Sequence, residues 1–297
     1  MSAFRYGWNG PQNEKGSFWV AFDACTREPK QWKAELYAAA RKVAARTEKP
    51  LWLCSSGGID SEIMCHAFFD QGIDFSVLTI EHAGGMNKHD IGFAREWCRK
   101  HDVAQKIIHL DIQSFIEADI HAYTKQGYIA ERIFPYAQLR LLEIVERMGG
   151  FAVLGAGEQH YRIDPTTSTP SEDDVFLEFD VGQTVAFEWC AHNNTVHEPF
   201  FFYSAPELCL SYVQQPLIQF ALSHPDIFRH PTSIYTLKRL VFQSAWTTHK
   251  PRPKYHGLEK VLPDARAARA KLRARLGDWL QLYRIPAAEF QRQLTAR

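Results

Sequence analysis

Apolar residues follow a regular pattern along the first half of the chain. Short and nearly continuous apolar runs, typical of strands buried on both faces of a parallel sheet, occupy residues 50–55, 75–82, 105–112 and 151–155. Helical segments, the first of them clearly amphipathic, lie beside these runs at residues 29–46, 60–70, 89–101 and 131–148. Strands that alternate with helices in this way indicate βαβ units, so we predict an α/β domain built on a parallel sheet.

The segments on either side of this domain have a different character. Residues 4–24 hold two aromatic-rich runs around a turn with Gly, Pro and Asn, which predicts a β-hairpin. A polar loop at 164–174 is followed by three predicted antiparallel strands, at residues 175–180, 184–191 and 198–203. Helices are predicted after them, at residues 205–222, 233–246 and 264–283. We therefore expect three parts: a hairpin and helix at 1–48, the α/β domain at 49–162, and a small antiparallel β element with a helical C-terminal region at 163–297.

Composition and charge narrow the class of protein. The chain has 297 residues, of which 45% are hydrophobic and 23% charged, as expected of an ordinary globular protein. Its 34 basic and 34 acidic residues cancel, which does not favour nucleic acid or an anionic membrane as the main partner. Residues 250–297 are an exception, with 12 Lys and Arg against 4 Asp and Glu, and this excess fits either a solvated helix face or contact with a polyanion.

No apolar run approaches the ~20 residues of a membrane helix. The N-terminal residues show no secretion signal, and the six cysteines include no CxxC pair. We therefore expect reduced thiols in a cytoplasmic protein.

The turn Ser55-Ser56-Gly57-Gly58 lies between an apolar run and a predicted helix, and it is the main candidate for chemistry. A helix N-terminus offers free backbone N–H groups and the positive end of the helix dipole, which together favour an anion. The two glycines let a phosphate approach the backbone closely, and the serines add hydroxyl donors. Asp60 would repel a bare phosphate, but it suits a site in which it holds a Mg²⁺ that bridges phosphate oxygens.

The order Ser56-Gly57-Gly58-Ile59-Asp60-Ser61 resembles the PP-loop of the ATP pyrophosphatase superfamily, the adenine nucleotide alpha-hydrolase-like enzymes. These include the synthetase domain of asparagine synthetase, NAD and GMP synthetases and several tRNA sulfurtransferases. The resemblance implies a doubly wound Rossmann-like sheet, with ATP bound by residues 55–61 and Asp60 as a catalytic and metal-binding residue. It is nearest to the asparagine synthetase branch, in which residues 163–297 would form a substrate or lid region.

The resemblance also suggests roles for residues farther along the chain. Backbone groups at Ile80 would pair with the adenine edge. Gly155, Gly157 and Glu158 loosely match a loop that helps to hold pyrophosphate and metal, although they equally fit a tight turn and a solvated carboxylate. Lys254, with Arg252 and Lys250 as alternates, is the candidate for neutralising the leaving pyrophosphate.

Enzymes of this superfamily cleave ATP to AMP and pyrophosphate and adenylate an oxygen of a small-molecule acceptor. One hypothesis is amidation by an amine or by ammonia from solution or a donor protein, as in asparagine synthetases. A second is transfer of sulfur to a heterocycle, with Cys65, Cys98 or Cys190 as carrier or with a sulfur donor protein. A third is a regulatory module that binds nucleotide without catalysis.

Two further expectations concern the acceptor and the assembly. One interpretation of four aromatic residues is a pocket for a flat acceptor, lined by Trp189, Phe200, Phe201 and Tyr203. The same four residues fit an ordinary hydrophobic core equally well. The predicted helix at 264–283 is rich in Leu and Arg, which makes it a candidate for pairing with a second copy of the chain.

Overall fold

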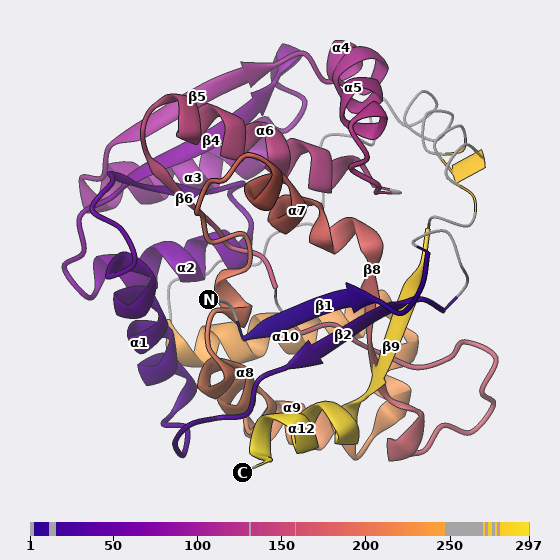
Figure 1. The fold of residues 1–297 in the computed structure, drawn as a ribbon. Helices are drawn as coiled ribbons and strands as arrows, with labels where there is room; N and C mark the ends of the chain where they lie inside the picture. Colours follow the sequence, from indigo (N-terminus) through magenta and orange to yellow (C-terminus); the bar gives the residue numbers. More distant parts are fainter. Residues whose placement is uncertain are drawn as a thin grey trace.

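The centre of the protein is a four-stranded parallel sheet in the order β5-β4-β3-β6 (Figure 1). The computed structural model describes residues 3–11, 16–130, 132–157, 159–246, 270, 273–274, 277 and 280–296. All three pairings in the sheet are parallel, between β3 (Leu51–Cys54), β4 (Ser76–His82), β5 (Gln105–Leu110) and β6 (Phe151–Leu154). The chain runs outward from β3 to β4 and β5 and then returns to β6 on the other side of β3. The topological switch point therefore lies between β3 and β6.

Helices cover both faces of this sheet, which confirms the predicted doubly wound α/β fold. Leu53 of β3 belongs to a core shared with the first helices, α1 (Trp32–Ala44), α2 (Ile59–Phe69) and α3 (Lys88–His101). Its neighbour Cys54 belongs to a second core, shared with α5 (Ile120–Lys125), α6 (Ile133–Arg147) and α7 (Val185–His192). Successive side chains of a strand point to opposite faces, so the apolar runs of the sequence serve two cores at once.

Two antiparallel sheets accompany the central one. The predicted hairpin is present as β1 (Phe4–Trp8) and β2 (Phe18–Phe22), while β7 (Tyr161–Arg162), β8 (Phe176–Asp180) and β9 (Leu282–Pro286) form a three-stranded sheet. Figure 1 shows β9 and helix α12 (Ala287–Thr295) beside the hairpin. The Phe22 and Phe290 rings meet edge-on with their centroids 4.7 Å apart, and the side chain of Gln281 accepts a hydrogen bond from the Phe18 amide. The two ends of the described chain thus pack on each other.

The remaining elements are helical. Residues 113–125, for which the sequence pattern gave no prediction, form helices together with Ile112, the last residue of the predicted strand 105–112. These helices are α4 (Ile112–Ser114), η2 (Phe115–Asp119) and α5. The second half contains short 3-10 turns, namely η3 (Glu172–Asp174), η4 (Val181–Thr184), η5 (Phe201–Tyr203) and η6 (Pro225–Arg229), besides η1 (Ala83–Gly85) in the first half. Of the three helices predicted after residue 204, the first two are confirmed, although 205–222 is divided into two helices. These elements are α8 (Pro206–Val213), α9 (Pro216–Leu222) and α10 (Pro231–Ala245). No helix in the described ranges is long and apolar enough to cross a membrane.

Three predictions for the second half are wrong. Residues 184–191 are not a strand but the helix α7, because their buried side chains, Val185, Ala186, Trp189 and Cys190, recur at helical spacing. Residues 198–203 are not a strand either; only Glu198 bridges to β6, and a 3-10 turn follows. The end of the predicted helix at 264–283 belongs to β9, which pairs with β8 from far along the chain. Most of that predicted helix lies outside the described residues.

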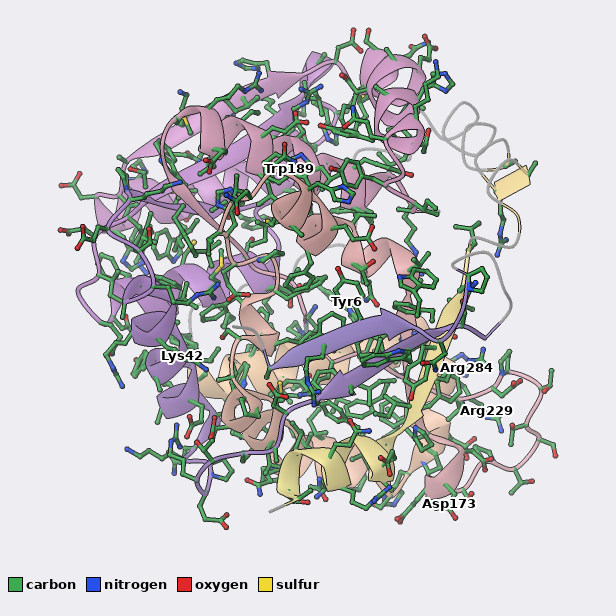
Figure 2. The ribbon with its side chains drawn as sticks, in the orientation of Figure 1. Tyr6, Lys42, Asp173, Trp189, Arg229 and Arg284 are labelled. Carbon is green, nitrogen blue, oxygen red and sulfur yellow. The ribbon has the colours of Figure 1, made fainter. Side chains whose placement is uncertain are left out.

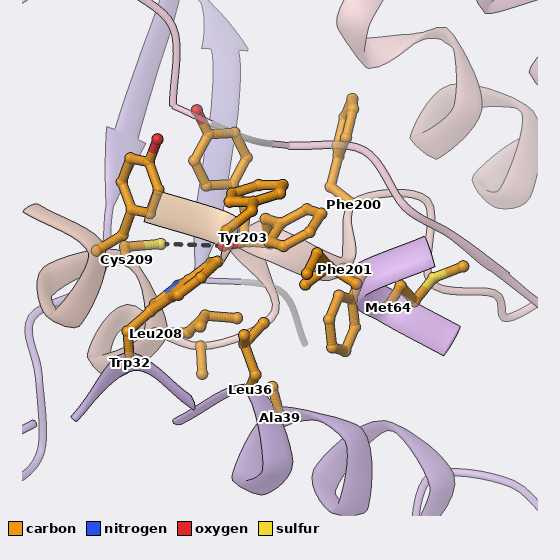
Figure 3. Packing of buried hydrophobic residues seen from close by; sticks show 14 of the residues in the cluster. Trp32, Leu36, Ala39, Met64, Phe200, Phe201, Tyr203, Leu208 and Cys209 are labelled. Atoms are coloured by element: carbon orange, nitrogen blue, oxygen red, sulfur yellow. Dashed lines mark hydrogen bonds between the residues drawn. The ribbon is translucent and has the colours of Figure 1, made fainter. Parts of the chain in front are cut away.

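The four aromatic residues considered for a flat ligand are core residues instead. Phe200, Phe201 and Tyr203 are almost fully buried and pack with α1 and α8, as Figure 3 shows. Trp189 belongs to the other core, on the α7 side of the sheet, where Figure 2 labels it. Because the four rings are divided between two cores, they do not line one pocket.

Candidate functional site

The loop Ser55–Gly58 joins the carboxyl end of β3 to the first turn of α2, beside the switch point of the sheet. Gly57 has φ 80°, a left-handed conformation that suits glycine. A Cβ on Gly57 would lie 1.7 Å from the carbonyl oxygen of Asp90, in the first turn of α3. Both the backbone angle and the contact with α3 therefore require glycine at position 57.

Hydroxyl groups of the loop hold its amides close together. The N–H of Gly57 donates to Ser55 Oγ at 3.3 Å, and the N–H of Gly58 donates to Ser56 Oγ at 3.2 Å. Ser61 Oγ accepts from Ser55 Oγ and donates to the carbonyl oxygen of Gly58 at 2.9 Å. The two amide bonds are long for N–H···O hydrogen bonds, so they are weak and leave both amides able to bind a stronger acceptor.

The first turn of α2 follows the loop directly and adds donors to the candidate site. Ile59 is buried, so the predicted role of this residue rests on its backbone alone. The amides of the first turn have no partner four residues earlier in the helix, and they carry the positive end of its dipole. The loop and the first turn together form the strand–loop–helix arrangement that the sequence predicted.

Asp60 forms an ion pair that the sequence did not reveal. Lys238 Nζ, from the helix α10, lies 2.5 Å from Asp60 Oδ1, and Lys238 is only 9% exposed. Tyr235, one turn earlier on α10, lies near enough to feel both charges, and burial raises the pKa of its hydroxyl. The sequence does contain a sign of this buried charge, because Lys238 interrupts the apolar face of α10, next to the buried Leu237 and Phe242.

The loop after β6 meets the same turn, as its place beside the switch point requires. A Cβ on Gly155 would lie 2.8 Å from Ser61 Cα, so only glycine lets the two loops approach so closely. Gly157 has φ 87°, and a Cβ there would lie 2.8 Å from the ring of Tyr203. The structure thus places Gly155 against the proposed phosphate loop and Gly157 against the aromatic core.

The carboxyl end of β4 is held by a residue that the sequence did not single out. Asn87 donates through Nδ2 to the carbonyl oxygen of Ile80 at 3.0 Å and accepts through Oδ1 from the amide of His82 at 2.8 Å. An adenine at the edge of Ile80 would share or replace these contacts, so this role of Ile80 stays a prediction. Glu81 pairs with Arg95 at 3.0 Å.

Some predicted site residues lie outside the described chain, namely Glu158, Lys250, Arg252 and Lys254. Within the described ranges, no group of three or more His, Cys, Asp or Glu side chains could hold a metal ion. Mg²⁺ needs no such group, because it keeps several waters and binds through one or two carboxylates plus substrate phosphates. Asp60, a single carboxylate beside the loop, fits that mode.

The cysteines proposed as sulfur carriers are buried thiols. Cys65 and Cys98 line a small cavity behind the loop, together with Ser55 and Gly57. Burial raises the pKa of Cys98 to about 11 and that of Cys190 to about 11, and it raises the pKa of Cys65 well above its usual value. Because the thiolate is the nucleophile, these thiols are poorly suited to sulfur transfer in this conformation.

Comparison with known proteins gives distant structural likenesses. No protein-family model and no curated protein matches the chain. An NH3-dependent NAD synthetase from Campylobacter jejuni is similar over 75% of this chain and 99% of its own, with 16% sequence identity and a TM-score of 0.34. An NMN synthetase from Francisella tularensis shares 13% identity over 75% of this chain and 98% of its own, with a TM-score of 0.34. A U34-tRNA thiolase from Methanococcus maripaludis shares 15% identity over 75% of this chain and 82% of its own, also with a TM-score of 0.34.

At these TM-scores the likenesses establish neither a family nor a substrate. None of the three structures is an asparagine synthetase, so that branch stays a prediction. The argument for function therefore rests on the site itself.

Proposed function

We propose that the chain binds ATP at residues 55–61 and cleaves it between the α- and β-phosphates, transferring adenylate to an oxygen of a small-molecule acceptor. The observation that carries the proposal is the position of this loop. It leaves the central strand β3 at the switch point, where open α/β sheets bind their ligands, and it directs backbone amides and hydroxyls into one place. The pair of Asp60 and Lys238 beside it adds one charge of each sign.

The donors and charged side chains of the site suit the negative charge that develops in this reaction. The acceptor oxygen attacks the α-phosphorus, the bond to the bridging oxygen breaks, and negative charge grows on the departing pyrophosphate. The loop amides and the ammonium of Lys238 stabilise that charge as it develops. Mg²⁺, held by Asp60 and the phosphates, would supply further positive charge. Lys238 is at present bound to Asp60 and would turn to the phosphates when the metal takes its place.

The state of the cysteines favours a nitrogen nucleophile over sulfur in the second step. All six thiols lie in described parts of the chain, and burial is the largest cause of a raised pKa at each of them. An amine or ammonia would displace AMP without help from a protein thiol. Sulfur transfer from an external donor is the second candidate, and binding of nucleotide without turnover is the third.

Release of pyrophosphate tests the proposal. The purified chain is incubated with ATP, Mg²⁺ and pools of amino acids, nucleobases or sugar acids, and pyrophosphate and AMP are both measured. We expect one pool to give the two products in equal amounts. Asp60→Asn and Lys238→Met should each lower the rate about 10²–10³-fold, the usual effect of removing one charge-stabilising group. Lys100→Met removes an exposed lysine of α3 and should leave the rate unchanged.

Two results would contradict the proposal. One is ATP turnover that is as fast in Asp60→Asn as in the wild type. The other is ATP that binds to the wild type but yields no AMP with any pool, which would favour the regulatory module. Wild-type rates in a Cys65→Ser and Cys98→Ser double variant would support the nitrogen nucleophile, whereas loss of AMP formation there would favour sulfur.

A further inference from the structure

Trp246, the first residue after α10, is buried against the end of another helix and is only 7% exposed. Its indole ring stacks on His66 of α2, with the ring centroids 5.5 Å apart and the ring planes at 19° to each other. Its Nε1 donates a hydrogen bond at 3.0 Å to Oδ2 of Asp70, the first residue after α2. Trp246 therefore joins the end of α10 to the end of α2.

Helix α1 contacts the same tryptophan. Lys33 Nζ lies 4.6 Å from the centre of the Trp246 ring and donates to the carbonyl oxygen of Ala245 at 2.9 Å. An ammonium group is attracted both to the face of an indole and to the carbonyl end of a helix. Tyr37 donates through its hydroxyl, at 2.6 Å, to the same Asp70 oxygen that accepts from Trp246. Three helices thus meet at one side chain and fix its position.

Helix α10 contacts α2 at a second place, the proposed active site. Lys238 Nζ lies 2.5 Å from Asp60 Oδ1 in the first turn of α2, whereas Trp246 lies against the last turn. The two residues of α10 are eight positions apart, or about 12 Å along a helix, and Asp60 and Asp70 are ten positions apart, or about 15 Å. The two lengths agree, so α10 runs beside α2 in the same direction, and the contact at Trp246 determines where Lys238 lies.

We propose that Trp246 is a positioning residue, which holds the backbone of α10 in place while the ammonium of Lys238 moves from Asp60 to the phosphates of ATP. A lysine side chain is flexible, so its ammonium reaches a defined position only from a fixed backbone. Misplacement of a catalytic group by about 1 Å can lower a rate by about 10²-fold. The role of Lys238 in catalysis rests on the proposed function, whereas the control of its position by Trp246 does not.

The first measurement needs no ATP. The nucleotide-free full chain is acetylated with N-hydroxysuccinimidyl acetate, and mass spectrometry follows Lys238, which should react slowly in the wild type because it is paired and buried. Trp246→Phe keeps a ring on His66 but loses the hydrogen bond to Asp70, which should speed the labelling of Lys238 about two- to tenfold. Trp246→Leu also loses the stacked ring and should speed it further.

Trp189→Phe is the matched control. Trp189 is 6% exposed and stacks on a histidine, His197, with the ring planes at 20° to each other. It belongs to the core on the other face of the central sheet, away from α10. Trp189→Phe should therefore leave the labelling of Lys238 unchanged.

The second measurement is the release of pyrophosphate from ATP. Trp246→Phe should lower kcat roughly tenfold and leave the KM for ATP unchanged, because Lys238 acts on charge that develops only in the transition state. In a Lys238→Met background the same change should have no further effect, since no ammonium remains to be positioned. A purely structural role would lower the rate by the same factor in both backgrounds.

Two results would overturn the role of Trp246. One is labelling of Lys238 that is as slow in Trp246→Phe and Trp246→Leu as in the wild type. The other is a loss of rate in Trp246→Phe that is equally large with and without Lys238. A wild type that releases no pyrophosphate would contradict the proposed function, while the labelling would still decide whether Trp246 holds Lys238 in place.

Discussion

The replacement Gly57→Ala tests the loop geometry on which the site depends. At φ 80° a residue with a Cβ is destabilised by about 1–2 kcal/mol. The new Cβ would lie 1.7 Å from the carbonyl oxygen of Asp90 and 2.5 Å from its carbonyl carbon, so the loop or α3 has to shift. Overpacking of this kind costs about 1–3 kcal/mol. We therefore expect the free energy of unfolding to fall by about 2–5 kcal/mol, the sum of the two ranges.

Gly58→Ala, in the same loop, is the matched control. Gly58 has φ −72°, which any residue adopts, and its Cβ would lie 3.1 Å from the movable hydroxyl of Ser56. Its effect should stay within about 1 kcal/mol of the wild type. Urea unfolding followed by tryptophan fluorescence measures both variants, and equal slopes show that the same unfolding is compared. The argument fails if Gly57→Ala is as stable as the wild type, or if the two variants lose the same stability.

Three further predictions concern the buried polar groups. Burial lowers the pKa of His197 to about 4, so its neutral form stabilises the fold. This contribution to the free energy of unfolding, up to about 3 kcal/mol, is complete above pH 6.5 and is lost as the pH falls towards 4. A His197→Asn variant should lack this part of the pH dependence measured by urea unfolding. Arg46→Met should cost about 3–5 kcal/mol because it leaves the carboxylate of Glu198 buried and unpaired, and adding Glu198→Gln should restore most of the loss in the same assay; a double variant as unstable as the single one contradicts this. Cys65 and Cys98 should react with Ellman's reagent at pH 8 only as fast as the protein opens, and rapid labelling of the native chain, located by mass spectrometry, would contradict their burial.

Local pattern was sufficient for the central sheet and for the strand–loop–helix geometry of residues 55–61. An apolar strand such as Leu51–Cys54 is recognisable because alternate side chains enter two different cores, which leaves no polar position in the run. The loop was recognisable because its chemistry lies within seven consecutive residues. The same reasoning failed at 184–191, where an apolar run of strand length is a helix. Length and apolarity do not distinguish a short buried helix from a strand when the packing partners are unknown.

The site residues and strand pairings that could not be predicted from the sequence are those that depend on contacts between distant segments. Lys238 follows Asp60 by more than half of the chain, and β9 reaches β8 from the far end, so neither contact has a local signature. Lys238 nevertheless leaves one trace in the sequence, because it places a charge in the apolar face of α10, beside the buried Leu237 and Phe242.

A buried charge of this kind is costly unless it is paired. Lys238 has Asp60 as a partner, so its charge is neutralised within the protein. The proposed function gives this pair a second use. With Mg²⁺ on Asp60, Lys238 would be released towards the phosphates of ATP, where its charge stabilises the leaving pyrophosphate. The exception to the apolar pattern of α10 is thus explained by the same loop that the sequence singles out.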